Sequence, residues 1–422
     1  MAAETDATGP ARTYLVGGAV RDELLGLDVV ERDWVVTGAT PDDLLSRGYR
    51  QVGASFPVFL HPDTGEEYAL ARTERKQGRG YHGFTVAFDP HITIEQDLER
   101  RDLTINAMAR DPEGGLVDPF GGREDLDKRI LRHVSPAFSE DPLRVLRVAR
   151  FAARFHDLGF RIHPDTLELM RHIAAVGELD HLVPERAWTE IRRAMGSKRP
   201  SVFVQVLRDC DALSHLLPEV DCLFGIPQPE RYHPEVDTGV HLMMALDQAA
   251  KLSDDEDVRV AVLFHDLGKG VTPADQLPSH RGHEETGLPL VEAVCARYRV
   301  PNHTRRLALQ VCAHHLDCHR LLAARPKTVF RLLERLDALR QPDIEPFLAA
   351  CEADYLGRKG LDQRPYPQAE RLRAALAAAL AVRATDLRQR PEGRVLEGKA
   401  LGEALRRARI EAIGELAVDP GE

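Results

Sequence analysis

Paired glycines and paired carboxylates lie close together near the start of the chain, in the stretch YLVGGAVRDELLGLDVVERDWVVT (residues 14–37). Gly17 and Gly18 let the backbone approach a phosphate group, and the helical pattern after them offers free N–H groups to an anion, to which Arg21 adds a forked cationic contact. Glu31 and Asp33 are two residues apart, so on an extended chain they point to the same side. Such carboxylates can hold divalent ions that activate a hydroxyl and stabilise a leaving pyrophosphate. The stretch therefore predicts a phosphate cradle followed by a metal clamp.

Either feature alone is ambiguous, because GG before a helix is usually a tight turn and an acidic pair is usually a solvated face. Together they resemble motif A of the nucleotidyltransferase superfamily, in the version found in bacterial tRNA nucleotidyltransferases (CCA-adding enzymes) and poly(A) polymerases. The resemblance implies that Glu31 and Asp33 hold catalytic Mg²⁺. It also implies that Gly17, Gly18 and Arg21 bind ATP or CTP. The family pattern is Asp-x-Asp, so Glu31 keeps the charge but moves the oxygens by one methylene.

Two further stretches belong to the same N-terminal region. LERRDLTINAMA (residues 98–109) predicts an amphipathic helix with Leu103 and Ile105 as packing positions, and it matches the family motif RRDxxxN. This match implies that Arg101 contacts the nucleotide. The basic, glycine-rich residues 72–84 predict a mobile loop, which in the family is tied to the switch from C to A addition. The alternative is an ordinary surface hairpin.

The segment SEDPLRVLRVARFAARF (residues 139–155) predicts a helix with Ser139 as its N-cap. Its arginines recur three or four residues apart and share one face: Arg144, Arg147, Arg150 and Arg154. A basic helical face more often serves solubility, but here it stands beside EDxxR, the base-reading motif of the family.

The hydrogen-bonding groups of that motif match two of the four bases. Asp141 offers an acceptor and Arg144 a donor, which complements the exocyclic amine and ring nitrogen that cytosine and adenine share. Uracil and guanine present the reverse pattern. A protein template of this kind accepts CTP and ATP, while Arg147 and Arg150 meet the triphosphate or the primer end.

A set of imidazoles and a carboxylate in the second half of the chain predicts a metal site: His241, His265, Asp266, His283 and His315. A His-Asp doublet alone is weak, because such pairs arise by chance, but this order resembles the HD phosphohydrolase superfamily. The mixed donors suit magnesium, manganese, iron or nickel.

The predicted fold class is α+β, with a small mixed sheet in the head followed by helices. The expected parts are an extension without fixed structure (1–12), a nucleotidyltransferase head (13–139), a helical neck (140–217), a linker (218–237), an HD unit (238–339) and a helical tail in contact with tRNA (340–422).

Composition limits the class of protein. The chain has 422 residues and a net charge of −11, yet residues 371–409 are locally basic, which favours RNA contact there or a solvated helical face. The absence of a long apolar run or an apolar signal core predicts a cytoplasmic protein without membrane contact. Six scattered cysteines fit reduced thiols. We expect a monomer or homodimer.

Head, neck and HD unit in one chain resemble the proteobacterial family of multifunctional CCA proteins, from residue 14 to the end. That resemblance implies CCA addition to tRNA from CTP and ATP, together with phosphohydrolase activity on 2′,3′-cyclic, 2′- and other phosphates. Three alternatives stay open: a poly(A) polymerase, an HD phosphohydrolase with a decayed head, and a non-catalytic RNA-binding protein.

Overall fold

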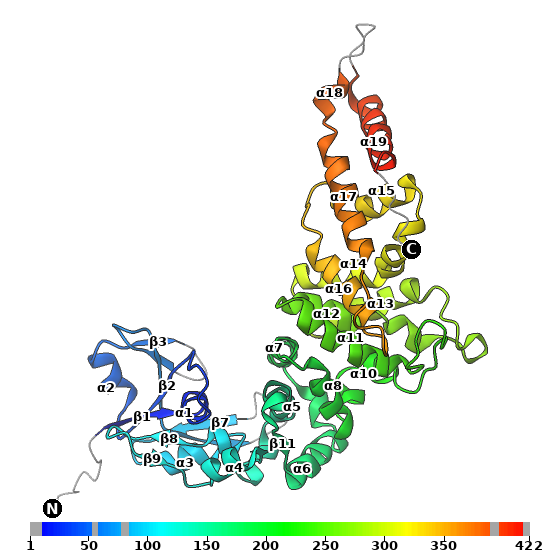
Figure 1. Ribbon diagram of the computed structural model, residues 1–422. Helices are drawn as coiled ribbons and strands as arrows, with labels where there is room; N and C mark the ends of the chain where they lie inside the picture. Colours follow the sequence, from blue (N-terminus) through cyan, green and yellow to red (C-terminus); the bar gives the residue numbers. More distant parts are fainter. Residues whose placement is uncertain (1–10, 53–57, 77–83, 389–395, 417–422) are drawn as a thin grey trace, which may run out of the picture. The chain divides into compact units, whose positions relative to one another are not determined.

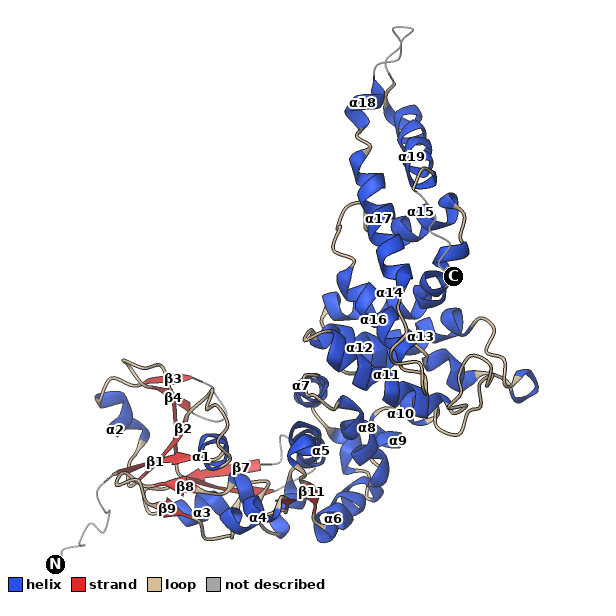
Figure 2. Ribbon diagram, viewed as in Figure 1, coloured by secondary structure: helices blue, strands red, loops and turns tan. Residues whose placement is uncertain are grey.

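The computed structural model describes residues 11–52, 58–76, 84–388 and 396–416. The chain forms two compact units: unit 1 holds residues 1–194 and 202–216, and unit 2 holds residues 195–201 and 217–422. All described strands belong to unit 1, whereas the described part of unit 2 is built from helices (Figures 1 and 2). No helix in the described ranges is both long and apolar enough to cross a membrane.

A seven-stranded mixed sheet forms the centre of the head, in the order β3-β4-β5-β2-β1-β8-β9. Its strands are β1 (Arg12–Val16), β2 (Asp33–Thr37), β3 (Arg50–Val52), β4 (Val58–Leu60), β5 (Glu67–Leu70), β8 (Ala109–Arg110) and β9 (Leu116–Val117). β2 pairs antiparallel with β1 and parallel with β5. In this register Asp33 lies opposite Val16 on one side and Glu67 on the other, so the acidic residues gather where β1 ends.

Both faces of the sheet are buried, because successive strand residues point to opposite faces. Val35 packs on one face together with α3 (Ile94–Glu99), and Val36 packs on the other with α2 (Pro41–Ser46). A separate hairpin of β6 (Arg72–Lys76) and β7 (Phe84–Phe88) flanks the predicted mobile loop, whose residues 77–83 lie outside the described part of the chain.

The glycine turn leads directly from the sheet into a short helix, as the sequence predicts. α1 (Gly18–Leu24) follows Gly17, whose φ of +68° is readily adopted only by glycine. The RRD stretch differs from its prediction, because only a single 3₁₀ turn, η2 (Thr104–Asn106), forms there. Asp102 accepts hydrogen bonds from the N–H of Leu103 and from Asn106 Nδ2, and these local bonds replace those of an amphipathic helix.

The rest of the head and the neck are mainly helical. Their elements are α4 (Gly122–Lys128), β10 (Ile130–Leu131), η3 (Pro136–Glu140), α5 (Leu143–Phe155), β11 (Arg161–Ile162), α6 (Pro164–Ala175), α7 (Pro184–Met195), α8 (Pro200–Asp209) and α9 (Leu213–Leu216). The prediction that Ser139 caps α5 is wrong, because Ser139 belongs to η3. The side chain of Asp141 instead accepts a hydrogen bond from the N–H of Leu143.

Unit 2 packs its helices around small residues. Its helices are α10 (Pro218–Asp221), α11 (Thr238–Leu252), α12 (Glu256–Phe264), α13 (His283–Arg297), α14 (Asn302–His319), α15 (Pro326–Arg335), α16 (Glu345–Leu356), α17 (Pro367–Ala381), α18 (Ala384–Arg388) and α19 (Gly398–Gly414). α16 approaches α11 so closely that a Cβ on Gly357 would lie 2.5 Å from Cα of Ala245. The helices α11, α12, α14 and α16 thereby converge on one centre.

The structure confirms the α+β class. Two boundaries differ from expectation: residues 218–237 contain α10 and lie within unit 2, and α16 extends the helical centre beyond residue 339. The expected N-terminal extension falls mainly on residues 1–10, outside the described residues, and Arg12 already begins β1.

Candidate active sites

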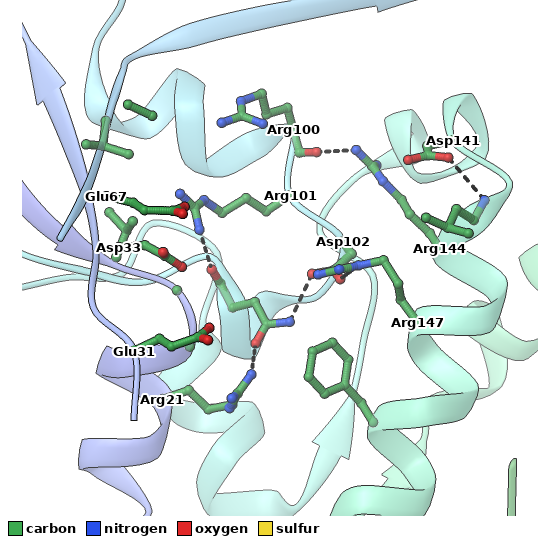
Figure 3. A pocket seen from close by; sticks show the side chains of 18 of the residues that line it. Arg21, Glu31, Asp33, Glu67, Arg100, Arg101, Asp102, Asp141, Arg144 and Arg147 are labelled. Carbon is green, nitrogen blue, oxygen red and sulfur yellow. Dashed lines mark hydrogen bonds and ion pairs between the residues drawn. The ribbon is translucent and has the colours of Figure 1, made fainter. Parts of the chain in front are cut away.

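A cavity of about 630 Å³ lies in unit 1 between the end of β1, the start of β2 and the helices α5 and α7 (Figure 3). It is lined by every residue that the sequence predicts for nucleotide and metal binding in the head: Gly17, Gly18, Arg21, Glu31, Asp33, Arg101, Asp141, Arg144, Arg147 and Arg150. Its head side carries carboxylates together with arginines, and α5 adds a further row of arginines from the helical side.

Three carboxylates face the cavity from the head. Asp33 begins β2, Glu31 precedes it by two residues, and Glu67 begins β5 beside Asp33. Desolvation by the cavity walls raises the pKa of Asp33, and the charge of Glu31 adds to this while Arg101 opposes it. Carboxylate oxygens are the donors that Mg²⁺ prefers. The three side chains therefore fit the ion that the family implies.

The glycine turn lies directly under two guanidinium groups. A Cβ on Gly17 would lie 2.7 Å from Nη1 of Arg101, and a Cβ on Gly18 would lie 3.5 Å from Nη2 of Arg21. The two glycines thus let cationic groups approach the backbone at the N-terminus of α1. This corner of the cavity is suited to an anion.

Arg21 is fixed between head and neck. Its side chain is 3% exposed, its Nε donates to Asp22 Oδ1 at 2.8 Å, and its guanidinium carbon lies 5.1 Å from the ring centres of Phe151 and Phe155. Arg101 is held by an ion pair of 3.2 Å with Asp97. Both arginines are therefore positioned before any ligand binds.

The arginine face of α5 is held by acidic partners from neighbouring elements. Arg147 Nε donates to Asp102 at 2.7 Å, and Arg150 Nε donates to Glu190 of α7 at 2.5 Å. Burial alone would raise the pKa of Asp102, but Arg147 and the hydrogen bond from Asn106 outweigh it and hold that pKa well below its usual range. The ion pairs therefore fix the direction in which the arginine row faces the cavity.

The predicted base-reading pair has additional partners. Asp141 Oδ2 accepts a hydrogen bond of 2.9 Å from Arg186 of α7. Arg144 donates to the backbone carbonyls of Ala137 (2.9 Å) and Arg100. Arg186 and Glu190 were not predicted, because α7 shows only a basic surface pattern in the sequence, and its packing against α5 is a tertiary feature.

Unit 2 brings all five predicted metal ligands together with Asp354. Their donor atoms form two groups, each within 4.8 Å: His241, His265 and Asp354 in one, and Asp266, His283 and His315 in the other. All six side chains are at most 5% exposed. Asp354 lies on α16, beyond the predicted end of the HD unit, and only the packing of α16 against α11 brings it to the centre.

The protonation of the four imidazoles is set by the backbone. Each Nδ1 lies beside a carbonyl oxygen: His241 at Gly357 (3.0 Å), His265 at Val262 (2.7 Å), His283 at His280 (2.7 Å) and His315 at Val311 (3.0 Å). A carbonyl only accepts, so each Nδ1 carries a proton and Nε2 is the nitrogen that faces the centre.

The Nε2 atoms that face the centre lie close to carboxylate oxygens and to one another. Nε2 of His241 lies 2.9 Å from Asp354 Oδ1, and Nε2 of His283 lies 3.1 Å from Asp266 Oδ1 and 3.3 Å from Nε2 of His315. Burial lowers the pKa of His315 to about 3, whereas for His265 Asp266 and Asp354 outweigh burial and raise the pKa to about 10. The centre therefore attracts positive charge, and its donors fit a divalent cation.

Similarity to known proteins agrees with this geometry. Residues 13–132 match the Poly A polymerase head domain family, residues 159–223 match the family described as probable RNA and SrmB-binding site of polymerase A, and residues 238–356 match the HD domain family. The multifunctional CCA protein of Thioalkalivibrio sulfidiphilus is 61% identical over 411 residues, covering 97% of this chain and 100% of that protein. The chain belongs to the multifunctional CCA protein family.

Solved structures share the fold with this member of the multifunctional CCA protein family. A Thermotoga maritima CCA-adding enzyme complexed with tRNA-CCA is 20% identical with a TM-score of 0.62, covering 96% of this chain and 88% of that one. A CCA-adding enzyme in complex with CTP is also 20% identical with a TM-score of 0.63, covering 96% and 87%.

Proposed function

We propose that the chain adds C, C and A to tRNA 3′ ends from CTP and ATP without a nucleic-acid template, and that its HD unit hydrolyses phosphate esters. The observation that carries the first activity is the cavity of unit 1, in which three carboxylates face a row of fixed arginines. Membership of the multifunctional CCA protein family supports both activities.

In the proposed transfer, one group of cavity residues binds the metal ion and another binds the triphosphate. Mg²⁺, when held by Glu31, Asp33 and Glu67, supplies the charge that activates the terminal hydroxyl of tRNA and stabilises the leaving pyrophosphate. The glycine turn, with Arg21 and Arg101 above it, binds the triphosphate. Because these groups are held by other side chains beforehand, little ordering is needed when the nucleotide arrives.

Base choice is assigned to the start of α5. Asp141 accepts from the exocyclic amine of cytosine or adenine, and Arg144 donates to the neighbouring ring nitrogen. Asp141 already accepts from Leu143 and Arg186, but each carboxylate oxygen has two lone pairs, so an amine can still be bound. Arg147 and Arg150 are assigned to the triphosphate or the primer end.

The first activity is tested with tRNA that ends at the discriminator base. Incubation with CTP and ATP is expected to give products extended by C, C and A, read by sequencing, with no extension by UTP or GTP. A long tract of A would identify a poly(A) polymerase instead. No extension would leave an HD phosphohydrolase with an inactive head.

The second activity is assigned to the centre in unit 2. Two donor groups, one with His241, His265 and Asp354 and the other around Asp266, would hold a divalent ion, which would supply the positive charge needed for hydrolysis of a phosphate ester. The substrates are 2′,3′-cyclic, 2′- and other phosphates, and the ion is magnesium, manganese or nickel. Chelation should abolish hydrolysis of a 2′,3′-cyclic nucleotide. Adding back each ion in turn then identifies the ion that restores hydrolysis. Hydrolysis that persists in Asp266→Ala would contradict the assignment.

Contact with tRNA is assigned to the basic segment 371–409, whose described residues lie mainly on α17, α18 and α19. Two of its arginines form ion pairs within unit 2: Arg373 pairs with Glu345 at 2.7 Å, and Arg406 pairs with Glu334 at 3.0 Å. The remaining lysines and arginines would meet the tRNA backbone. We place both activities in the cytoplasm, where tRNA and nucleoside triphosphates are available.

A further inference from the structure

We propose that Glu235 is a positioning residue for the centre of unit 2. Its carboxylate holds the imidazole of His241 so that Nε2 faces the centre, and its negative charge strengthens that nitrogen as a metal ligand. The inference rests on the proposed hydrolytic function and extends it to a residue that contacts a ligand instead of the ion.

The carboxylate of Glu235 is enclosed by donors. Its side chain is 1% exposed, and its Oε1 lies 3.1 Å from Nδ1 of His241 and 3.0 Å from Nδ1 of His233. Its Oε2 accepts a hydrogen bond of 3.2 Å from the N–H of Lys359. A buried carboxylate is costly unless such donors surround it, so the three contacts hold it in place. The ring of His233 also packs edge-on against His241, with 4.6 Å between the ring centres.

His241 is thereby set apart from the other three imidazoles. A backbone carbonyl on Nδ1 decides which nitrogen carries the proton, and all four rings have that contact. A full negative charge at the same nitrogen additionally raises the basicity of Nε2. The nearest counterpart is Glu284, whose Oε2 lies 3.5 Å from Nδ1 of His283, farther than the 3.1 Å between Glu235 and His241, and whose side chain is 29% exposed.

The backbone next to Glu235 is strained in a way that supports this role. Val236 has a φ of +61°, which is an outlier for a β-branched residue. Its N–H donates to His233 (2.9 Å) and its carbonyl accepts from Gln228 (2.8 Å), so the surrounding loop imposes the conformation. Strain of this kind persists where the fold over-determines the position of a functional group. Here it aims the Glu235 carboxylate at His241.

The test is a titration with Co²⁺ followed by its visible absorption, which reports imidazole ligation. The protein carries Asp33→Ala, so that the head does not bind the ion. Glu235→Gln keeps the size of the side chain and removes its charge, and we expect the Kd for Co²⁺ to rise about ten- to hundredfold. Glu235→Asp keeps the charge at shorter reach and should recover part of the affinity.

Asp237→Asn is the matched control. It removes one charge from the same loop, where Asp237 Oδ1 caps α11 by accepting from the N–H of Val240 and Oδ2 accepts from the N–H of Gly225, and asparagine keeps the helix cap. We expect its Kd to equal that of the parent protein. A merely structural role for Glu235 would lower the thermal midpoint of the metal-free protein and leave the Kd unchanged.

Equal Kd values for Glu235→Gln and the parent protein overturn the proposal, and so does equal weakening in Asp237→Asn. Should Glu235→Gln fail to fold, an unchanged Kd and spectrum in Glu235→Asp overturn it. A parent protein that binds Co²⁺ tightly but hydrolyses no phosphate ester with any divalent ion would refute the hydrolytic function while leaving the positioning role in place.

Discussion

At the scale of single residues, Glu31 is where this chain departs from the Asp-x-Asp pattern of its family. The side chain lines the cavity beside Asp33 and carries the same charge as the residue it replaces. We expect Glu31→Asp to retain or improve nucleotide addition, because it restores the shorter ligand. The measurement is the single-turnover rate of C addition at saturating Mg²⁺. An inactive variant would show that the longer side chain is needed for something other than its charge.

Glu67 is the third carboxylate of the cavity, brought beside Asp33 by the pairing of β2 with β5. If it shares in holding Mg²⁺, Glu67→Gln should slow addition of C and A by more than about tenfold, the lower end of what even an outer metal partner costs. Raised Mg²⁺ should restore part of the rate. Glu66→Gln is the control, since Glu66 bonds to Trp34 instead of lining the cavity. Equal rates for Glu67→Gln and Glu66→Gln would exclude Glu67 from the site.

The residues that the sequence could reveal are those placed by local geometry. Glycine before a helix, carboxylates two apart and arginines three or four apart need no tertiary information, and the structure brings all of these together. The sequence did not predict roles for Glu67, Asp354 and Glu235, because tertiary structure brings each of them to its site. Strand pairing places Glu67, helix packing places Asp354, and a strained loop places Glu235.

At the scale of elements, local hydrogen bonds explain two places where the helices differ from those that the sequence predicts. The side chain of Asp102 bonds to the turn after it, so the RRD stretch forms η2 instead of an amphipathic helix, although its apolar residues are buried as predicted. α5 likewise starts at Leu143, where Asp141 bonds its first N–H, instead of at Ser139. Both differences fall on residues with proposed roles at the cavity.

Asp102 also joins the RRD turn to α5, since it pairs with Arg147 at 2.7 Å. We expect Asp102→Asn to lower the free energy of unfolding by about 2 kcal/mol at pH 7, because it removes the charge that pairs with Arg147 and leaves that guanidinium only its longer ion pair of 3.6 Å with Glu190. The folded pKa lies below the ordinary value of 3.8, so this stabilisation is present above about pH 4 and is lost as pH falls through the folded pKa. The difference in free energy of unfolding between the variant and the parent protein should therefore decrease at acidic pH.

Urea unfolding from pH 7 to pH 3 measures this gap. Asp127→Asn is the control, because its ion pair with Arg123 is exposed and should contribute less than about 1 kcal/mol. A gap that stays constant down to pH 3 would mean that the charge of Asp102 is not what stabilises the contact.

At the scale of the whole molecule, the two proposed sites lie in different compact units. Asp33→Ala should abolish nucleotide addition and leave hydrolysis of a 2′,3′-cyclic nucleotide intact. Asp266→Ala should do the reverse. The two rates are measured on the same preparations, with thermal midpoints as the check on folding. Loss of both activities in either folded variant would refute the assignment of one activity to each unit.

The central claim is that protein side chains choose the incoming base. The most direct measurement is single-turnover addition of CTP, ATP, UTP and GTP to tRNA lacking its last three nucleotides, for the parent protein, Asp141→Asn and Arg101→Ala. Asparagine offers a donor that can meet the O4 of uracil, so Asp141→Asn should reduce the preference for CTP over UTP by about ten- to hundredfold. Arg101→Ala should slow all nucleotides similarly, since phosphate carries no base identity. Full selectivity in Asp141→Asn, with selectivity lost in Arg101→Ala, would contradict the account.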